Sequence, residues 1–280
     1  MVRRLAGVAV VFSLVLPLSA RAQGAPKPAA APKPAPSAKA AQVDMELMTH
    51  AEIYEAIHGL GKTTVLVFNG GTEQRGPHDV LGGHTFIARR TAITMARELG
   101  NALVAPVNPF APAGGHLNAN TPGSVDLPMP AFLAVNEAIV NSMVVNGFTN
   151  IVLMGDHGGG QKEMGELATR LDQKFGEKGV HVYWSGDVYE KSQTEFDNWA
   201  KGRGLPLGSH AGVRDTSVLM FLGGDEYVRK DRLAPGDGKN GVNGDPRPST
   251  PEIGQVYFDI KVMNGVQQIR ALIAAKTGKK

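Results

Sequence analysis

Residues 63–78 read TTVLVFNGGTEQRGPH, and this stretch decides the fold class. It opens with an apolar, β-branched run, 63–68, of the kind found in strands that are buried on both faces of a parallel sheet. The run ends at the turn-forming cluster Asn-Gly-Gly at 69–71, and charged side chains follow at once. We therefore predict a central strand that leads into a polar loop.

The same alternation of strand and helix patterns continues along the chain. Short apolar runs predict strands, and stretches with helical spacing predict helices. The further strands are expected at 102–107, 151–154 and 180–184, and the helices at 85–99, 130–146, 162–175, 216–222 and 253–275. This order predicts an α/β fold, a mainly parallel sheet with helices on both faces. Ligands of such sheets bind beyond the carboxyl ends of the strands, where the glycine-rich turns of this chain lie.

The N-terminus has the order of a targeting signal. Arg3 and Arg4 precede the apolar stretch 5–18, and Ala20-Arg21-Ala22 has the small-x-small form of a cleavage site. We therefore predict a signal peptide over residues 1–22 and an exported protein, periplasmic or secreted. The alternative is an uncleaved N-terminal anchor. No later stretch is apolar enough, for long enough, to span a bilayer, so no membrane span is expected after cleavage.

The amino-acid composition changes along the chain and predicts a tether followed by one folded domain. Residues 23–42 consist almost wholly of Ala, Pro and Lys, which predicts an extended segment outside the fold. Residues 43–280 contain no second linker and are expected to form a single catalytic domain with a sizeable core.

Charge and cysteine content limit the partners and the metal chemistry. Of the 29 basic residues, six lie in the first 42 positions, where there is no acid, so the remainder carries 23 basic against 26 acidic residues. The basic isoelectric point therefore gives no argument for a nucleic-acid partner. The chain has no cysteine, so a metal would be held by nitrogen and oxygen ligands.

Three polar clusters follow apolar runs and are candidates for chemistry. They are 73–84, 156–159 and 210–217, and each contains at least one histidine. A hydrolytic metal site needs about three such ligands and one open position for water, and three clusters at one edge of a sheet favour a metallohydrolase. Each residue also has a simpler interpretation as a hydrogen-bonded turn histidine or, for Glu73 and Asp215, as a backbone cap. We interpret three other histidines, His50, His58 and His181, as surface or structural, and His116 is left undecided.

The clusters resemble the sequence motifs of the creatininase family. Members carry a Gly-x-x-Glu-x-His-Gly-Pro-His turn, a Pro-Gly-Thr segment, an Asn-Gly-His-Gly-Gly-Asn turn and a His-Ala-Gly-x-x-Glu-Thr-Ser segment. The corresponding residues here are GGTEQRGPH at 70–78, PGS at 122–124, GDHGGG at 155–160 and HAGVRDTS at 210–217. The order is the same throughout, and the similarity covers roughly residues 60–275.

The resemblance implies a three-layer α/β/α fold, often assembled as a homohexamer, with one or two divalent metals that activate water against an amide. It places Glu73 and His157 on metal-binding residues of the family. His210 falls on a histidine near the reacting group, which makes it a candidate proton carrier. Asp215 replaces the Glu of the last motif and is expected to orient His210 or to contact a metal.

Two departures from the family pattern change the expected metal site. The second metal-binding His of the family falls at Arg75, and a guanidinium has no lone pair for a cation. The aspartate that bridges two metals falls at His84, as in a subgroup with Gly-x-His at this place. We therefore predict one metal per chain, zinc first with manganese or iron as alternatives, held by Glu73, His84 and His157. Arg75 is expected either to act on the substrate, by binding its carboxylate or by stabilising developing negative charge, or to form an ion pair with a nearby acid.

The predicted function is that of an exported metal-dependent amidohydrolase that cleaves a C–N bond in a cyclic or linear small-molecule amide. His210, Asp215 and Arg75 are the catalytic candidates. Two alternatives remain: a non-catalytic relative that binds a small ligand, and a peptide-trimming hydrolase of the same family. The sequence does not name the substrate.

Overall fold

The computed structural model describes residues 42–278 of the chain. The signal peptide expected over residues 1–22, and the tether expected over 23–42 with the exception of Gln42, lie outside the described residues. The description below concerns the folded part alone.

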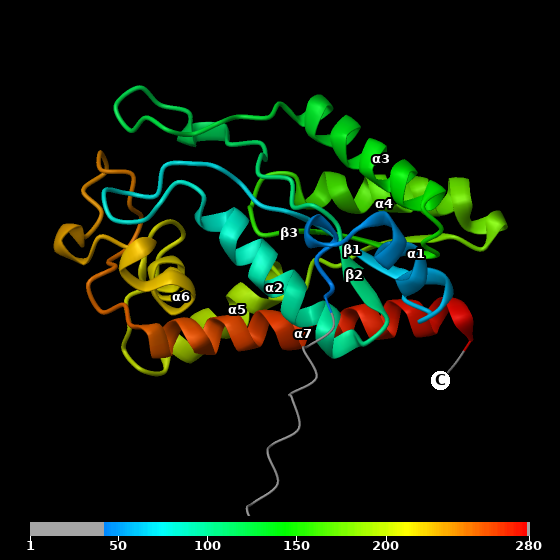
Figure 1. Ribbon diagram of the computed structural model, residues 1–280. Helices are drawn as coiled ribbons and strands as arrows, with labels where there is room; N and C mark the ends of the chain where they lie inside the picture. Colours follow the sequence, from blue (N-terminus) through cyan, green and yellow to red (C-terminus); the bar gives the residue numbers. More distant parts are fainter. Residues whose placement is uncertain (1–41, 279–280) are drawn as a thin grey trace, which may run out of the picture. The chain divides into compact units, whose positions relative to one another are not determined.

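A four-stranded parallel sheet forms the centre of this part (Figure 1). Its strand order is β2-β1-β3-β4, with β1 at Thr64–Asn69, β2 at Ala102–Val104, β3 at Asn150–Gly155 and β4 at His181–Trp184. All six residues of β1 are buried, as expected for an apolar run with a parallel neighbour on each side.

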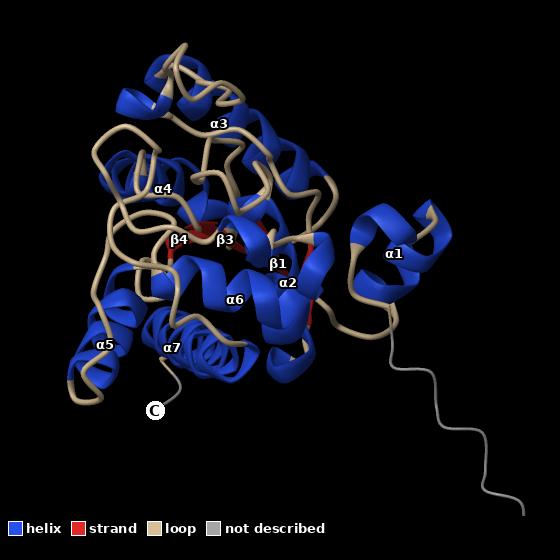
Figure 2. Cartoon of the chain, turned by 90° about the vertical axis from the view of Figure 1, so that its left-hand side faces the viewer, coloured by secondary structure: helices blue, strands red, loops and turns tan. Residues whose placement is uncertain are grey.

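Helices cover both faces of the sheet, which gives the three-layer α/β/α fold that the sequence predicts (Figure 2). One face is covered by α3 and α4, and the other by α2, α5, α6 and α7. The α-helices are α1 (His50–His58), α2 (Gly83–Leu99), α3 (Met129–Val145), α4 (Gln161–Phe175), α5 (Glu190–Lys201), α6 (Val213–Gly223) and α7 (Pro251–Thr277). Short 3-10 helices occur at Met45–Leu47, Gly114–His116, Gly176–Lys178, Gly224–Glu226 and Lys230–Arg232.

Most expected elements lie within a few residues of their predicted bounds, and the differences have local causes. The strand expected at 102–107 ends at Val104, shortly before Pro106, which has no N–H for a strand ladder. The helix expected at 216–222 begins three residues earlier, so that Asp215 lies in its first turn. Within the described residues, no helix is both long and apolar enough to cross a bilayer.

Two helices, α1 and α5, are absent from the sequence-based prediction. The start of α1 carries a recognisable signal, because Thr49 and Glu52 form a capping box in which each side chain accepts a bond from the backbone N–H of the other. The amphipathic α5 packs Phe196 into the core beside Tyr257 of α7.

The strand order locates the ligand site. The chain runs from β1 to β2 on one side and then crosses back to β3 on the other, so a topological switch point lies between β1 and β3. The loops that leave the carboxyl ends of two such strands diverge and open a crevice for a ligand. Here these loops carry Glu73 after β1 and His157 after β3.

Candidate metal centre

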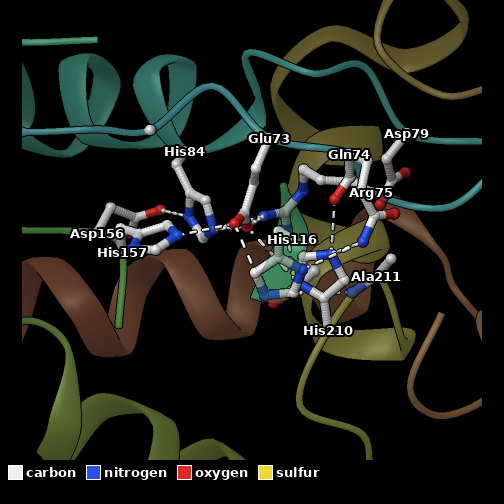
Figure 3. Close-up of polar contacts among 12 residues, drawn as sticks. Glu73, Gln74, Arg75, Asp79, His84, His116, Asp156, His157, His210 and Ala211 are labelled. Atoms are coloured by element: carbon white, nitrogen blue, oxygen red, sulfur yellow. Dashed lines mark hydrogen bonds and ion pairs between the residues drawn. The ribbon is translucent and has the colours of Figure 1, made fainter. Parts of the chain in front are cut away.

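Glu73 is the centre of the site. Its side chain is buried, and its two carboxylate oxygens face two imidazoles, with Oε1 at 2.8 Å from His84 Nε2 and Oε2 at 2.7 Å from His157 Nε2 (Figure 3). The metal-ligating atoms of these three residues all lie within 4.8 Å of one another. The fold therefore brings together the three side chains that the sequence predicts as metal ligands.

Each ligand candidate comes from a different element. Glu73 lies in the loop after β1, His84 is in the first turn of α2, and His157 follows β3. The turn after β3 requires glycine for close packing, because a Cβ at Gly159 would lie only 2.3 Å from the Pro112 carbonyl oxygen. A side chain at position 159 would therefore force the His157 turn away from the loop that contains Pro112.

A buried chain of charged groups orients His84. Its Nδ1 lies 2.8 Å from Asp156 Oδ2, and the other oxygen of Asp156 is 2.6 Å from Lys261 Nζ. Lys261 belongs to α7, is fully buried, and also donates to the Val188 carbonyl at 2.9 Å. Although burial raises it, the pKa of Asp156 is lowered overall by the Lys261 charge and the His84 hydrogen bond. An ionised Asp156 holds the His84 proton on Nδ1, which makes Nε2 the nitrogen that would bind a metal once Arg75 has moved away from it.

Arg75 lies behind the ligand candidates. It is fully buried, with Nη2 at 3.0 Å from Asp215 Oδ2, Nη1 at 3.5 Å from Glu73 Oε1, and Nη1 at 2.6 Å from His84 Nε2. It is not among the residues that line the cavity at the site. Of the two roles expected for Arg75, the geometry favours the ion pair.

The three ligand candidates suit a divalent metal in donor type and in their surroundings. Two imidazoles and a carboxylate are the donor set of a hydrolytic zinc site, and a carboxylate behind a ligating histidine is typical of such sites. Two contacts must rearrange when an ion enters. Arg75 Nη1 faces the lone pair of His84, and His157 Nδ1 accepts a bond from the Gly159 N–H at 2.9 Å, which leaves the His157 proton on Nε2.

His210 and His116 complete a second pair of imidazoles around Glu73. His210 Nδ1 lies 3.5 Å from Glu73 Oε1, and His116 Nε2 lies 3.8 Å from Oε2. The two rings stack with their centroids 4.1 Å apart. His116, which the sequence left undecided, therefore belongs to the site. Burial, and then the charge of Arg75, lower the pKa of His210 to about 4, so its ring is neutral at pH 7.

Asp215 holds the turn before α6. Its Oδ2 accepts a hydrogen bond from the backbone N–H of Ala211 at 3.0 Å and forms an ion pair with the guanidinium of Arg75. Ala211 has a positive φ of 50°, a strained conformation that this hydrogen bond helps to maintain. Burial raises the pKa of Asp215, but Arg75 and Arg214 lower it overall to about 2. Asp215 is therefore an ionised acceptor that positions the His210 turn.

A cavity of about 280 Å³ opens on this cluster. This volume suits a small molecule. Its charged and aromatic lining comprises Glu73, His84, His116, Asp156, His157, Tyr189, His210, Arg214, Asp215 and Tyr257. The other four histidines do not line the cavity: His50 and His58 are on α1, His181 bonds to Asp172 at 3.0 Å, and the buried His78 lies 3.0 Å from Thr216 Oγ1.

Comparison with known proteins supports the fold described above. The family model described as creatininase, creatinine amidohydrolase, matches residues 46–269. A solved structure titled Creatininase Mn is 19% identical with a TM-score of 0.68, over 82% of this chain and 98% of that one. A mutant creatininase complexed with creatine is 18% identical with a TM-score of 0.69, over the same shares. A putative creatinine amidohydrolase from Bacteroides fragilis NCTC 9343 is 20% identical with a TM-score of 0.64, over 81% and 95%.

No functionally curated protein matches the chain. At these identities the solved structures establish the fold, and the family model supplies the assignment. Because that model matches residues 46–269 of the 280-residue chain, the protein belongs to the creatininase family.

Proposed function

We propose that this protein is a metal-dependent amidohydrolase that cleaves a C–N bond in a small cyclic or linear amide. The observation that carries the proposal is the meeting of Glu73, His84 and His157 at the floor of a cavity, at the switch point of the sheet. An orienting carboxylate behind His84 strengthens it, because a metal-ligating histidine usually donates its other ring N–H to such a group.

Glu73, His84 and His157 are the residues that would hold the metal. A divalent metal bound there supplies a Lewis acid for the substrate carbonyl and an acidified water as the nucleophile. Zinc fits this donor set best, with manganese or iron as alternatives, and a solved relative is titled Creatininase Mn.

His210 is the residue best placed to move a proton. Its Nε2–H donates to the Gln74 carbonyl oxygen at 2.7 Å, so the lone pair is on Nδ1, on the side of Glu73 and the cavity. A neutral imidazole in this orientation accepts a proton from the attacking water and returns it to the leaving amine. Asp215, with a pKa near 2, is a poor proton donor and instead fixes the His210 turn.

Arg75 serves the site through charge. It lies between Glu73 and Asp215 and compensates both buried carboxylates, which are costly to bury unpaired. Its positive charge, behind the ligand candidates, makes the electrostatic potential at the metal position less negative. Its long-range effect on developing negative charge is therefore favourable, although it does not touch the cavity.

The cavity and a relative support a small substrate. A volume of about 280 Å³ holds a compact amide, and a creatine-bound creatininase is among the similar structures. Export of the protein and assembly into a homo-oligomer, a hexamer by family resemblance, are further parts of the proposal. The polar lining of the cavity does not separate a free amide from the end of a short peptide.

A non-catalytic role as a small-ligand-binding protein is the second candidate. The specific observation in its favour is the contact of 2.6 Å between Arg75 Nη1 and His84 Nε2, which occupies the lone pair that a metal needs. The amidohydrolase would show metal-dependent turnover of an amide, and the ligand-binding protein would not.

Hydrolysis by the purified full chain tests the proposal. The protein is freed of metal, reloaded with Zn²⁺ or Mn²⁺, and assayed on a panel of amides, lactams and short peptides. We expect turnover that depends on the metal, is absent from His157→Ala, and persists in His58→Ala, which alters an exposed histidine on α1. Binding of panel members without turnover under any metal would favour the ligand-binding role instead.

A further inference from the structure

In the single-metal site His210 carries a proton, and His116, which stacks on it, has no role. We propose that Glu73, His116 and His210 form a second divalent-cation site, which shares the Glu73 carboxylate with the first. Their ligating atoms also lie within 4.8 Å of one another. This site uses neither of the positions at which the chain departs from the family motif, Arg75 and His84.

The separations suit a metal better than a hydrogen bond. Ligand atoms about 2.0–2.1 Å from a tetrahedral zinc lie roughly 3.3 Å apart. Glu73 Oε1 is 3.5 Å from His210 Nδ1 and Oε2 is 3.8 Å from His116 Nε2. Among the described residues, neither nitrogen forms a hydrogen bond, so both nitrogens face the space beside Glu73 without a competing partner.

Gln74 supports both imidazoles from behind. Its backbone carbonyl accepts His210 Nε2–H at 2.7 Å, which leaves Nδ1 unprotonated and ready to ligate. Its side-chain amide lies 3.1 Å from His116 Nδ1. For His116 to ligate through Nε2, the amide must present its oxygen to Nδ1–H. Rotation of the Gln74 amide by half a turn would break one hydrogen bond, the 3.2 Å bond that the Gly76 N–H donates to Gln74 Oε1.

Glu73 can serve both sites because the two histidine pairs lie on different sides of its carboxylate (Figure 3). Each pair approaches both oxygens: His84 and His210 are next to Oε1, and His157 and His116 are next to Oε2. Paired hydrolytic metals lie about 3.5–4 Å apart, a spacing that a bridging carboxylate allows. With one carboxylate for two cations, the second ion binds more weakly than the first.

Occupation of this second site changes what His210 can do. A Nδ1 that ligates a metal no longer accepts a proton, so the second ion removes the proton carrier of the proposed hydrolysis. This consequence rests on the proposed function, whereas the cation site itself does not. We therefore expect hydrolysis to rise with the first equivalent of zinc and to fall as the second site fills.

Metal titration tests the site without an activity assay. The metal-free full chain is titrated with Zn²⁺ by calorimetry, and bound zinc is counted by elemental analysis after saturation and desalting. We expect two ions per chain, with the second bound at least tenfold more weakly. His116→Gln and His210→Gln should each lose the weaker ion and keep the tighter one, while His157→Gln should weaken the tighter ion most.

Control measurements separate loss of a ligand from loss of the fold. His116 is partly exposed on the loop 105–128, so its replacement should leave the thermal unfolding curve unchanged, and His58→Gln should bind like the wild type. Saturation at one ion per chain would overturn the second site. A second ion that persists unchanged in both His116→Gln and His210→Gln would overturn it equally. If two ions bind but no amide is cleaved, the cation site stands and the proposed hydrolysis fails.

Discussion

Replacing Lys261 by Met should weaken metal binding at a site that the lysine never touches. Lys261 Nζ is 2.6 Å from Asp156 Oδ1, and Asp156 Oδ2 is 2.8 Å from His84 Nδ1. Without the ammonium, a fully buried carboxylate keeps only the imidazole as its partner. Breaking a buried ion pair on one side costs about 3–5 kcal/mol. Loss of an outer-shell partner typically lowers metal affinity about 10–100-fold.

The measurement is zinc affinity by competition with a chromogenic chelator, together with urea unfolding of the metal-free protein. The matched control is the double variant K261M/D156N, in which the amide oxygen still accepts His84 Nδ1–H and no charge remains unpaired. We expect the double variant to recover much of the stability and affinity lost by K261M. Wild-type affinity and stability in K261M would show that Lys261 does not position His84.

Three further predictions follow from other contacts. Burial raises the pKa of Asp79 to about 7, so its stabilising effect is present below about pH 4, the pKa of an unfolded Asp, and is lost as the pH rises through 7. The melting temperature of Asp79→Asn should therefore rise relative to that of the wild type as the pH goes from 5 to 8. A difference in melting temperature that does not change with pH would contradict this. Arg75→Lys should lower the unfolding free energy by about 1–3 kcal/mol, because a point charge cannot serve Glu73 and Asp215 together. An equally stable Arg75→Lys with reduced kcat/KM would instead show that Arg75 acts in the reaction. A chain that begins at Val43 should melt like the form that begins at Gln23, and a clearly lower melting temperature would mean that the tether packs on the domain.

The sheet could be predicted because short stretches of sequence are enough to indicate its strands. The runs at β1 and β3 have apolar centres, VLVF and IVLM, and end at glycine turns, and these features alone indicate buried parallel strands. The ligand candidates Glu73 and His157 were accessible for the same reason, since each directly follows such a strand. Strand ends and α1 were harder, because they depend on single residues such as Pro106 and on a short capping box.

The rest of the site depends on tertiary contacts that local sequence patterns do not predict. Lys261 is one lysine within a long C-terminal helix, and only its burial against Asp156 reveals a role. His116 lies on a loop rich in Pro, Gly and Asn whose path over the sheet cannot be read from its composition. Arg75 was recognised as unusual, but its complete burial behind His84 decides between an ion pair and a substrate contact.

The departures from the family motif form a coupled set. At position 84 an imidazole replaces a carboxylate, and at position 156 a carboxylate replaces the glycine of the Asn-Gly-His turn. The two are in contact at 2.8 Å, so the negative charge has moved from the ligand position to the residue behind it. His84→Asp alone would place a second carboxylate against Asp156, and D156N alone would leave Lys261 without its counter-ion. The combined variant H84D/D156N relieves the repulsion.

Zinc affinities of the wild type, the two single variants and the double variant therefore form a cycle with a definite expectation. The double variant should bind zinc more tightly than the sum of the two single losses predicts, by about 0.5–3 kcal/mol, the range measured for residues in direct contact. This result would show that the two substitutions act together, with the negative charge moved from position 84 to position 156, which lies beside it in space. Additivity within about 0.5 kcal/mol would show instead that the two substitutions are independent, and that His84 does not rely on Asp156 to present its lone pair.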